Sequence, residues 1–212
     1  MPILGPCELQ QLRRQRSHQG CCANSLPLDA ESVTAMHHAP EIRQARSSDA
    51  TAIASIANAN LGPSYFSLPP CGLTLVAVED GSPIGFIYSH TIDPSEPLAN
   101  CVRDAGLVAS RSDPIMVLQT IVVASTHRHR GIGAALVRAT LQGLESVSIV
   151  SPAWEHPDGR VPVHGLLEQF GFVPMHRFSD YWLQDSIDRN YACPDCGHPC
   201  HCAMILFCRP RA

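Results

Sequence analysis

The feature that most restricts the possible folds is an apolar strand that runs, through a glycine loop, into an amphipathic helix. Residues Ile115 to Val123 form a near-continuous apolar run rich in branched side chains, as expected of a central strand buried on both faces. From Gly133 to Leu144 the apolar residues recur at helical spacing, while Arg138 and Gln142 stand on the opposite side. The segment therefore predicts a layered core in which a helix follows a central strand.

The loop between this strand and this helix has the composition of an anion-binding site. Gly131 and Gly133 stand two apart and are followed by small alanines, so backbone N–H groups can approach a ligand closely. These groups also lie at the positive end of the helix dipole, which attracts anions. Arg128 and Arg130 add charge-assisted donors suited to a pyrophosphate or a ribose 3′-phosphate. The structural alternative is a plain strand-to-helix turn with solvated arginines.

Two other phosphate-binding loops fit this segment poorly. A Walker loop requires a Lys followed by Ser or Thr, and the sequence contains no lysine. A dinucleotide-binding fingerprint requires Gly or Ala three residues after Gly133, where Leu136 stands. The hairpin expected before the loop is also wrong for a doubly wound nucleotide-binding fold. Both alternatives are therefore disfavoured.

The chain from Glu41 onward alternates short strands and helices. Ser47 or Ser48 caps a first helix that ends at Gly62, and Asp80-Gly81 joins two strands as a tight hairpin. Residues 91–113 are polar and broken, which predicts a loop holding about one turn of helix. The expected strands are 42–46, 73–78, 84–89, 115–123, 147–150, extended segments from 172 to 182, and 203–208; further helices are expected at 133–144 and 163–170. This order predicts one mixed α/β layer structure.

Residues 1–40 differ from the rest and are interpreted as a flexible N-terminal extension before a domain at 41–212. They combine arginines with Gln, His, Cys and Pro and show no sustained periodicity. A mitochondrial leader is a minor alternative, because Glu8 and the prolines argue against it. Met36 is a possible translational start, so whether residues 1–35 belong to the mature protein stays open.

The composition leads to expectations about solubility and about binding partners. No apolar run approaches the roughly 20 residues that span a bilayer, so we expect a soluble, cytoplasmic protein without a membrane partner. The net charge of −4 disfavours nucleic acid, whose general binders carry a basic surplus. The sequence predicts a monomer or a homodimer and does not separate the two.

The glycine loop and its flanks resemble the GNAT superfamily of N-acetyltransferases. The family's motif A, Arg/Gln-x-x-Gly-x-Gly/Ala, is matched here by Arg128, Gly131 and Gly133. The resemblance runs from about Glu41 to the end, and includes the hairpin from Ala77 to Phe86 and the ending Leu167-Glu-Gln-Phe-Gly-Phe172. It implies a central mixed, mostly antiparallel sheet of about six to seven strands flanked by helices.

The resemblance also implies a cofactor, acetyl-CoA, and a way to hold it. The pantetheine arm would pair with strand 115–123 like an added strand, and the loop amides from Arg130 to Ala135 would hold the pyrophosphate. The thioester would lie where strands 115–123 and 147–150 part, and an amine would attack it directly in a ternary complex. The residues expected to bind the cofactor are Ile121, Val122, Val123, Arg128, His129, Arg130, Gly131, Ile132, Gly133, Ala134 and Ala135.

The sequence departs from the family pattern at the proton-transfer groups. Strand 115–123 contains no carboxylate, and Leu167 stands where the family often has a tyrosine that protonates the leaving thiolate. A free amine has a pKa near 10, so a base or a water chain must take its proton. The candidate bases are Glu155, His156 and His164, and the candidate acid is Tyr181; solvent is the alternative for either role.

A cluster of cysteines near the C-terminus predicts a metal site. Residues 193–202 hold four cysteines in the pattern Cys-x-x-Cys-Gly followed by Cys-x-Cys, a spacing that lets four thiolates converge on one tetrahedral Zn²⁺. The predicted ligands are Cys193, Cys196, Cys200 and Cys202, with His198 and His201 in reserve and Cys208 in the core. Four protein ligands leave no open position, so the zinc would be structural. Iron or a set of reduced thiols is the alternative.

The leading hypothesis is an N-acetyltransferase that moves an acetyl group from acetyl-CoA to a primary amine. The acceptor would be a small molecule or a peptide; acidic residues in the loops 91–113 and 152–161 mildly favour a cationic one. The alternatives are a catalytically inactive acyl-CoA-binding sensor or scaffold, and an interaction module formed by the cysteine-rich end.

Overall fold

A computed structural model describes residues 39–210 except 64, 65, 67, 68, 70, 94, 108–114, 145 and 146. Its strands are β1 (Glu41–Gln44), β2 (Leu73–Glu79), β3 (Ser82–Thr91), β4 (Ile115–Val123), β5 (Ser148–Glu155), β6 (Val173–Phe178) and β7 (Ala203–Arg209). Its helices are η3 (Ser47–Asp49), α1 (Ala50–Leu61), α2 (Pro97–Asp104), η4 (Ser125–His127), α3 (Ile132–Leu141), α4 (His164–Gln169) and α5 (Leu183–Asp188). The predicted N-terminal extension lies almost wholly outside the described residues.

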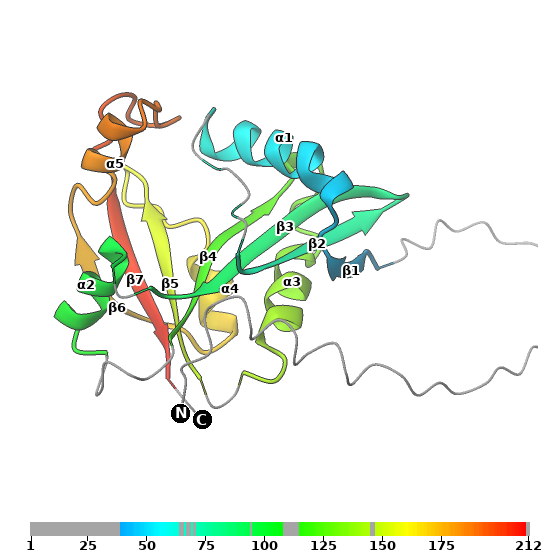
Figure 1. Cartoon of the computed structure of the whole chain (residues 1–212), viewed down its shortest axis with the longest axis horizontal. Helices are drawn as coiled ribbons and strands as arrows, with labels where there is room; N and C mark the ends of the chain where they lie inside the picture. Colours follow the sequence, from blue (N-terminus) through cyan, green and yellow to red (C-terminus); the bar gives the residue numbers. More distant parts are fainter. Residues whose placement is uncertain are drawn as a thin grey trace, which may run out of the picture.

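The strands form a seven-stranded sheet in the order β1-β2-β3-β4-β5-β7-β6 (Figure 1). Every neighbouring pair is antiparallel except β4 and β5, which are parallel. The expectation of a mixed, mostly antiparallel sheet flanked by helices is therefore confirmed. The hairpin between β2 and β3 turns at Asp80 and Gly81, whose φ angles of 50° and 78° are those of a type I′ turn.

The sheet divides where β4 and β5 part. The parallel pairing covers three residue pairs, from Ile115 with Ser148 to Val117 with Val150. Beyond them the Ser151 hydroxyl donates a hydrogen bond of 3.0 Å to the carbonyl of Leu118, and β5 continues as a partner of β7 instead. The two strands diverge in Figure 1, with β1 to β4 on one side and β5 to β7 on the other.

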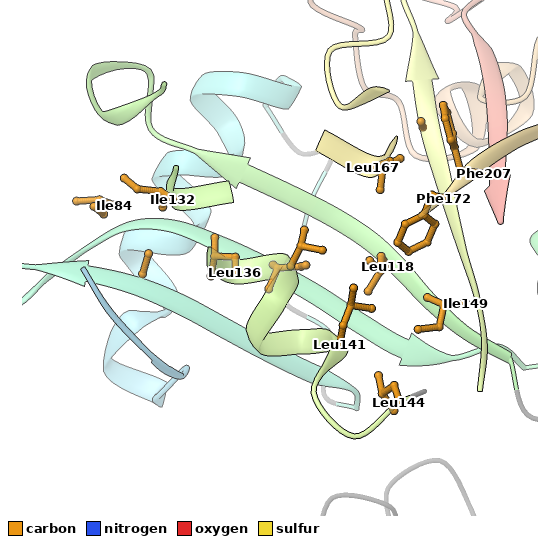
Figure 2. Close-up of a cluster of buried hydrophobic side chains, with 14 residues drawn as sticks. Ile84, Leu118, Ile132, Leu136, Leu141, Leu144, Ile149, Leu167, Phe172 and Phe207 are labelled. Carbon is orange, nitrogen blue, oxygen red and sulfur yellow. The ribbon is translucent and has the colours of Figure 1, made fainter. Parts of the chain in front are cut away.

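One face of the sheet is covered by α3 and α4, where the largest group of buried side chains lies (Figure 2). Leu136 and Val137 of α3 are fully buried, as the helical periodicity predicts. They pack with Leu118 and Ile149 of the sheet and with Phe172 beyond α4. The space below the parting of β4 and β5 is thus filled by apolar side chains on this face.

The other face carries α1 and α2, which contact different parts of the sheet. Buried residues of α1 pack on β2, β3 and β4; they are Ile53 and Ala57 against Val76, Val78, Phe86 and Val122. Buried residues of α2 pack on the start of β4 and on β5 and β7, beside the cysteines; among them are Leu98 and Val102 against Ile115, Val117, Val150 and Met204. Residues 64, 65, 67, 68 and 70, between α1 and β2, lie outside the described part of the chain.

The largest differences from the sequence predictions concern α2, β5 and α5; other boundaries shift by only a few residues. Helix α2 is longer than the single turn expected within residues 91–113. Its buried face consists of Leu98, Ala99 and Val102, and the polar residues around them hid this face in the sequence. Strand β5 extends to Glu155, since β7 pairs with it along its whole second half. Helix α5 was not expected; it lies between β6 and the cysteine cluster. No helix in the described ranges combines the length and the apolar character that crossing a membrane requires.

The corner between β1 and α1 is held by a buried ion pair. Asp49 is only 5% exposed and accepts two hydrogen bonds from the Arg43 guanidinium, at 2.7 and 3.0 Å. It also accepts a hydrogen bond of 2.7 Å from the backbone N–H of Arg46. The hydrogen bonds from Arg43 lower the pKa of Asp49 below its ordinary value, against the opposing effect of burial. The charged form of Asp49 is therefore the one that stabilises the fold.

We expect Asp49→Asn to lower the free energy of unfolding by about 1–3 kcal/mol at neutral pH, because it leaves Arg43 without its anionic partner. A lowered folded-state pKa means that the stabilisation is complete above about pH 4 and is lost as the pH falls through the folded-state pKa. Urea unfolding as a function of pH measures both effects. Asp104→Asn, at an exposed residue, is the control. A difference between Asp49→Asn and wild type that does not shrink in acid would contradict the assignment.

Candidate active site and metal centre

The predicted anion-binding loop has the backbone geometry of an oxyanion cradle. After η4 the chain passes through His129 and Gly131, with φ angles of 61° and 76°, and α3 begins at Ile132. The N–H of Ala135 donates to the carbonyl of Gly131, as the first regular helical bond. The backbone N–H groups of residues 129–134 have no acceptor among the described residues. They lie at the positive end of the dipole of α3 and are free to bind an anion.

The two arginines of the loop are engaged with neighbouring elements. Arg128 donates from Nε to the carbonyl of Val123, at 3.2 Å, and its guanidinium contacts the side-chain oxygen of Asn60 in α1. Arg130 pairs with Glu79 at the end of β2, with a hydrogen bond of 3.0 Å from one of its terminal nitrogens. His127 lies 3.4 Å from the same carboxylate. In this state the loop presents backbone amides, and its guanidinium groups brace it against α1 and β2.

The edge of β4 beyond the parting is open. The N–H of Ala124 bonds to the carbonyl of Ile84, so Ala124, Val122 and Thr120 direct their backbone groups toward β3. The backbone groups of Ile121 and Val123 therefore face the gap between β4 and β5. An extended ligand has two backbone positions of β4 to pair with, and Val122 is not one of them. The carbonyl of Val123 is the one that accepts from Arg128.

Two of the four predicted proton-transfer residues lie together at the end of β5. Glu155, the last residue of the strand, pairs with Arg177 of β6 at 2.6 Å. His156 follows it, stacks on the Trp154 ring with centroids 4.0 Å apart, and forms an ion pair with Asp195 in the cysteine cluster. Both side chains are mostly buried. They connect the end of β5 to β6 and to the cluster.

The other two lie elsewhere. His164 begins α4, pairs with Glu168 one turn later at 3.1 Å and contacts the edge of the Phe207 ring. Tyr181 packs edge-on against Trp182 in the group of side chains on the opposite face, near the cysteines. The structure therefore does not gather the four residues into one constellation. Leu167 of α4 is fully buried in the core between this helix and the sheet.

The four predicted metal ligands converge. The Sγ atoms of Cys193, Cys196, Cys200 and Cys202 all lie within 4.8 Å of one another. Neighbouring sulfurs are 3.4, 3.6 and 3.8 Å apart, and the four cysteines are free thiols. Four thiolates on a tetrahedral Zn²⁺ at about 2.3 Å stand about 3.8 Å apart. The donor set and its spacing fit zinc.

The surroundings of the cluster orient the sulfurs. The backbone N–H of His201 bonds to Cys196, and the indole N–H of Trp154 bonds to Cys202. The Ser186 hydroxyl accepts from the N–H of Cys200, at 2.9 Å. Trp154 and Ser186 were not predictable from the sequence, because both are distant along the chain and their contact with the cysteines depends on the order of β5, α5 and β7.

Without a cation the cluster would not hold four thiolates. Burial raises the pKa of Cys202 to about 12, and burial also raises the pKa of Cys200, with the neighbouring sulfurs adding to both shifts. A bound divalent cation offsets this repulsion and the cost of burial, as in other closed thiolate sites. The donor set and its spacing are those of a site that could hold a metal ion.

The chain resembles known proteins in its sequence and in its fold. The model of the acetyltransferase (GNAT) family matches residues 39–172. A search of curated proteins found no match. Among solved structures, Arabidopsis thaliana NAA60 in complex with a bisubstrate analogue is similar at a TM-score of 0.58 and 17% identity, covering 79% of this chain and 96% of that one.

Two further structures have the same fold at low identity. Ard1 from Thermoplasma volcanium has a TM-score of 0.53 at 17% identity and covers 80% of this chain and 96% of that one. The ribosomal-protein-S18-alanine N-acetyltransferase from Escherichia coli has a TM-score of 0.54 at 14% identity, with 81% and 94% covered. NAA60 has also been solved in complex with acetyl-CoA, at a TM-score of 0.55 and 17% identity.

Proposed function

Because this chain belongs to the GNAT family of acetyltransferases, we propose that it transfers an acetyl group from acetyl-CoA to a primary amine. The observation that carries the proposal is the run of free backbone amides from His129 to Ala134 at the start of α3. Six consecutive donors at a helix N-terminus match the many acceptor oxygens of a pyrophosphate. Ala135, which we had expected to contribute, uses its amide within α3.

The remainder of the cofactor lies along β4 in this proposal. The pantetheine arm pairs with the backbone of Ile121 and Val123, whose edge is open. Its thioester then reaches the point where β4 and β5 part, near Val117 and Val150. The carbonyl of Val123 becomes available when Arg128 turns toward the phosphates, which attract its charge.

The acceptor in this proposal is a primary amine of a small molecule or a peptide, and it attacks the thioester directly in a ternary complex. The enzyme from Escherichia coli is named for an alanine of ribosomal protein S18, and the NAA60 complex holds a bisubstrate analogue. At their low identity these likenesses support the fold and the general reaction. Glu155 and His156, the proton-transfer candidates at the end of β5, are engaged with Arg177 and Asp195.

Acetyl-CoA at about 100 times its dissociation constant should stabilise the protein by roughly 2.7 kcal/mol and raise its unfolding midpoint by about 5–10 °C. Gly131→Val should abolish the rise, because a side chain at its φ of 76° distorts the loop. Gly143→Val is the matched control, since Gly143 has a φ of 75° and equally open space but lies beyond α3. No rise in folded wild-type protein, or the same rise in Gly131→Val, would refute the proposed cofactor site.

A protein that binds acetyl-CoA without turnover is the second candidate, because Leu167 is buried and strand β4 carries no carboxylate. Binding alone does not separate the two. Release of CoA thiol in the presence of an amine does, when it exceeds the rate of acetyl-CoA hydrolysis measured without the amine.

We infer that the four clustered cysteines bind one structural Zn²⁺. The ion would be held by Cys193, Cys196, Cys200 and Cys202, and would fix the segment between α5 and β7. All four positions of a tetrahedral ion are filled by these ligands, so the zinc supplies charge and rigidity. It takes no part in the acetyl transfer.

Native mass spectrometry of the purified protein should find one zinc per chain, and Cys196→Ser should lose most of it and unfold at a lower temperature. Cys101→Ser, a change of the same kind at a half-buried residue of α2, should retain the metal. Chelation should reproduce the loss of stability in wild type and leave Cys196→Ser nearly unchanged. Equal metal content in Cys196→Ser and wild type would contradict the site.

A further inference from the structure

A histidine that the sequence analysis did not single out lies beside the parting of β4 and β5. His90 of β3 is the direct register partner of Val117, and Tyr88 is the partner of Thr120, with an irregularity between them. Val117 is the last residue of β4 that pairs with β5. Directly opposed residues of antiparallel strands have Cβ atoms about 5 Å apart. His90 is therefore one strand away from the point where the proposed thioester lies.

His90 lies on the face of the sheet that carries α1 and α2. On the α3 and α4 face, the parting is filled by Leu118, Ile149 and Phe172, which Figure 2 shows gathered there. Val117 packs on the other face, beside Leu98 and Val102 of α2. Because opposed residues share a face, the His90 side chain is on the α1 and α2 side. The imidazole therefore lies on the same side of the sheet as Val117, at the parting of β4 and β5.

The imidazole ring is held by two contacts, and the partner in each contact is itself held by a further hydrogen bond. Its Nε2 lies 3.1 Å from Oε2 of Glu96, which precedes α2. The other oxygen of Glu96 accepts a hydrogen bond of 2.9 Å from the N–H of Asp93. The Tyr88 ring stacks on the imidazole, with centroids 5.4 Å apart and planes 13° apart, and its hydroxyl donates to the carbonyl of Cys71. The ring therefore has one orientation.

The other ring nitrogen has no partner. Nδ1 of His90 is buried and forms no hydrogen bond with any residue that the structure describes. Burial raises the pKa of Glu96, but the hydrogen bonds from His90 and Asp93 outweigh burial and lower the pKa below its ordinary value. The carboxylate is therefore ionised at neutral pH. An ionised Glu96 holds the proton on Nε2, which leaves a lone pair on Nδ1. A carboxylate, an oriented imidazole and a free basic nitrogen form the arrangement of a general base.

We propose that His90 is the general base of the acetyl transfer, with Glu96 as the residue that positions it. The amine nitrogen forms a bond to the acetyl carbon as the carbon–sulfur bond breaks, and CoA leaves as a thiolate. Nδ1 takes the proton from the amine, directly or through one water molecule. The imidazolium then returns the proton to the thiolate, so the products are an amide and CoA thiol. This inference rests on the proposed function.

The pH dependence of the reaction depends on the groups around the ring. The titratable groups around the imidazole are Glu96 and Asp93, which precede α2, and Tyr88 of β3. The hydroxyl of Tyr88 donates to the carbonyl of Cys71. Burial raises the pKa of Tyr88 to about 12, so it stays neutral through the range of an assay. From α2, the apolar Leu98 and Val102 pack in the same cluster as Val117, together with Cys101, whose pKa is raised by burial. Glu96 is the charge that contacts the imidazole.

The test compares His90→Gln and Glu96→Gln with wild type, using acetyl-CoA and either a short peptide with a free α-amino group or putrescine as acceptor. His90→Gln should lower kcat about 10²- to 10⁴-fold and change the Kd of acetyl-CoA less than twofold. Its rate should keep rising with pH, because solvent hydroxide replaces the imidazole, whereas the wild-type rate levels off. Glu96→Gln should lower kcat by a smaller factor. His176→Gln, on the exposed edge strand β6, is the control.

A kcat for His90→Gln within threefold of wild type, with the same pH profile, would overturn the assignment. Failure of wild type to bind acetyl-CoA would instead refute the proposed function. A separate readout needs no turnover: ¹⁵N chemical shifts of labelled wild-type protein should show His90 protonated on Nε2 and unprotonated on Nδ1. The opposite tautomer would overturn the proposal whatever the activity, because Nδ1 would then carry the proton.

Discussion

The short parallel contact between β4 and β5 is the constraint on which the rest of the structure depends. Three residue pairs join the two halves of the sheet, and beyond Val117 and Val150 the strands separate. Among the described residues, the separation leaves Ile121 and Val123 without a neighbouring strand on that side, although buried edges are normally paired or covered. An open strand edge that leads to six free backbone amides leaves polar groups of the protein without hydrogen-bond partners. The same groups suit an extended ligand that carries phosphates at one end.

The cysteine cluster lies at the end of β5, beside the gap between β4 and β5. The Trp154 indole at the end of β5 bonds to Cys202, and His156 pairs with Asp195 between two of the cysteines. On the other side, a Cβ atom at Gly62, just after α1, would lie 2.9 Å from the carbonyl of Ala192. The cluster thus contacts both β5 and the end of α1, which belong to different halves of the sheet.

Several features were predictable because a few neighbouring residues determine them. Gly131 adopts the left-handed conformation that its place before α3 requires, and Asp80-Gly81 forms the expected hairpin turn. The cysteine spacing predicted convergence that the sulfur positions confirm. The partners of Arg130 and His156 were not predictable, because Glu79 and Asp195 are distant in the chain. The length of helix α2 was underestimated, because its apolar face can be recognised only from its packing against β4.

The sequence by itself determined the family, the glycine loop before α3 and the convergence of the four cysteines, because each depends on residue type and on spacing along the chain. Tertiary structure decided what those parts face. The open edge of β4 depends on the order of the strands, and the pairing of His90 with Glu96 depends on how α2 packs against the sheet. No local pattern encodes these contacts, because they arise from burying both faces of one sheet together.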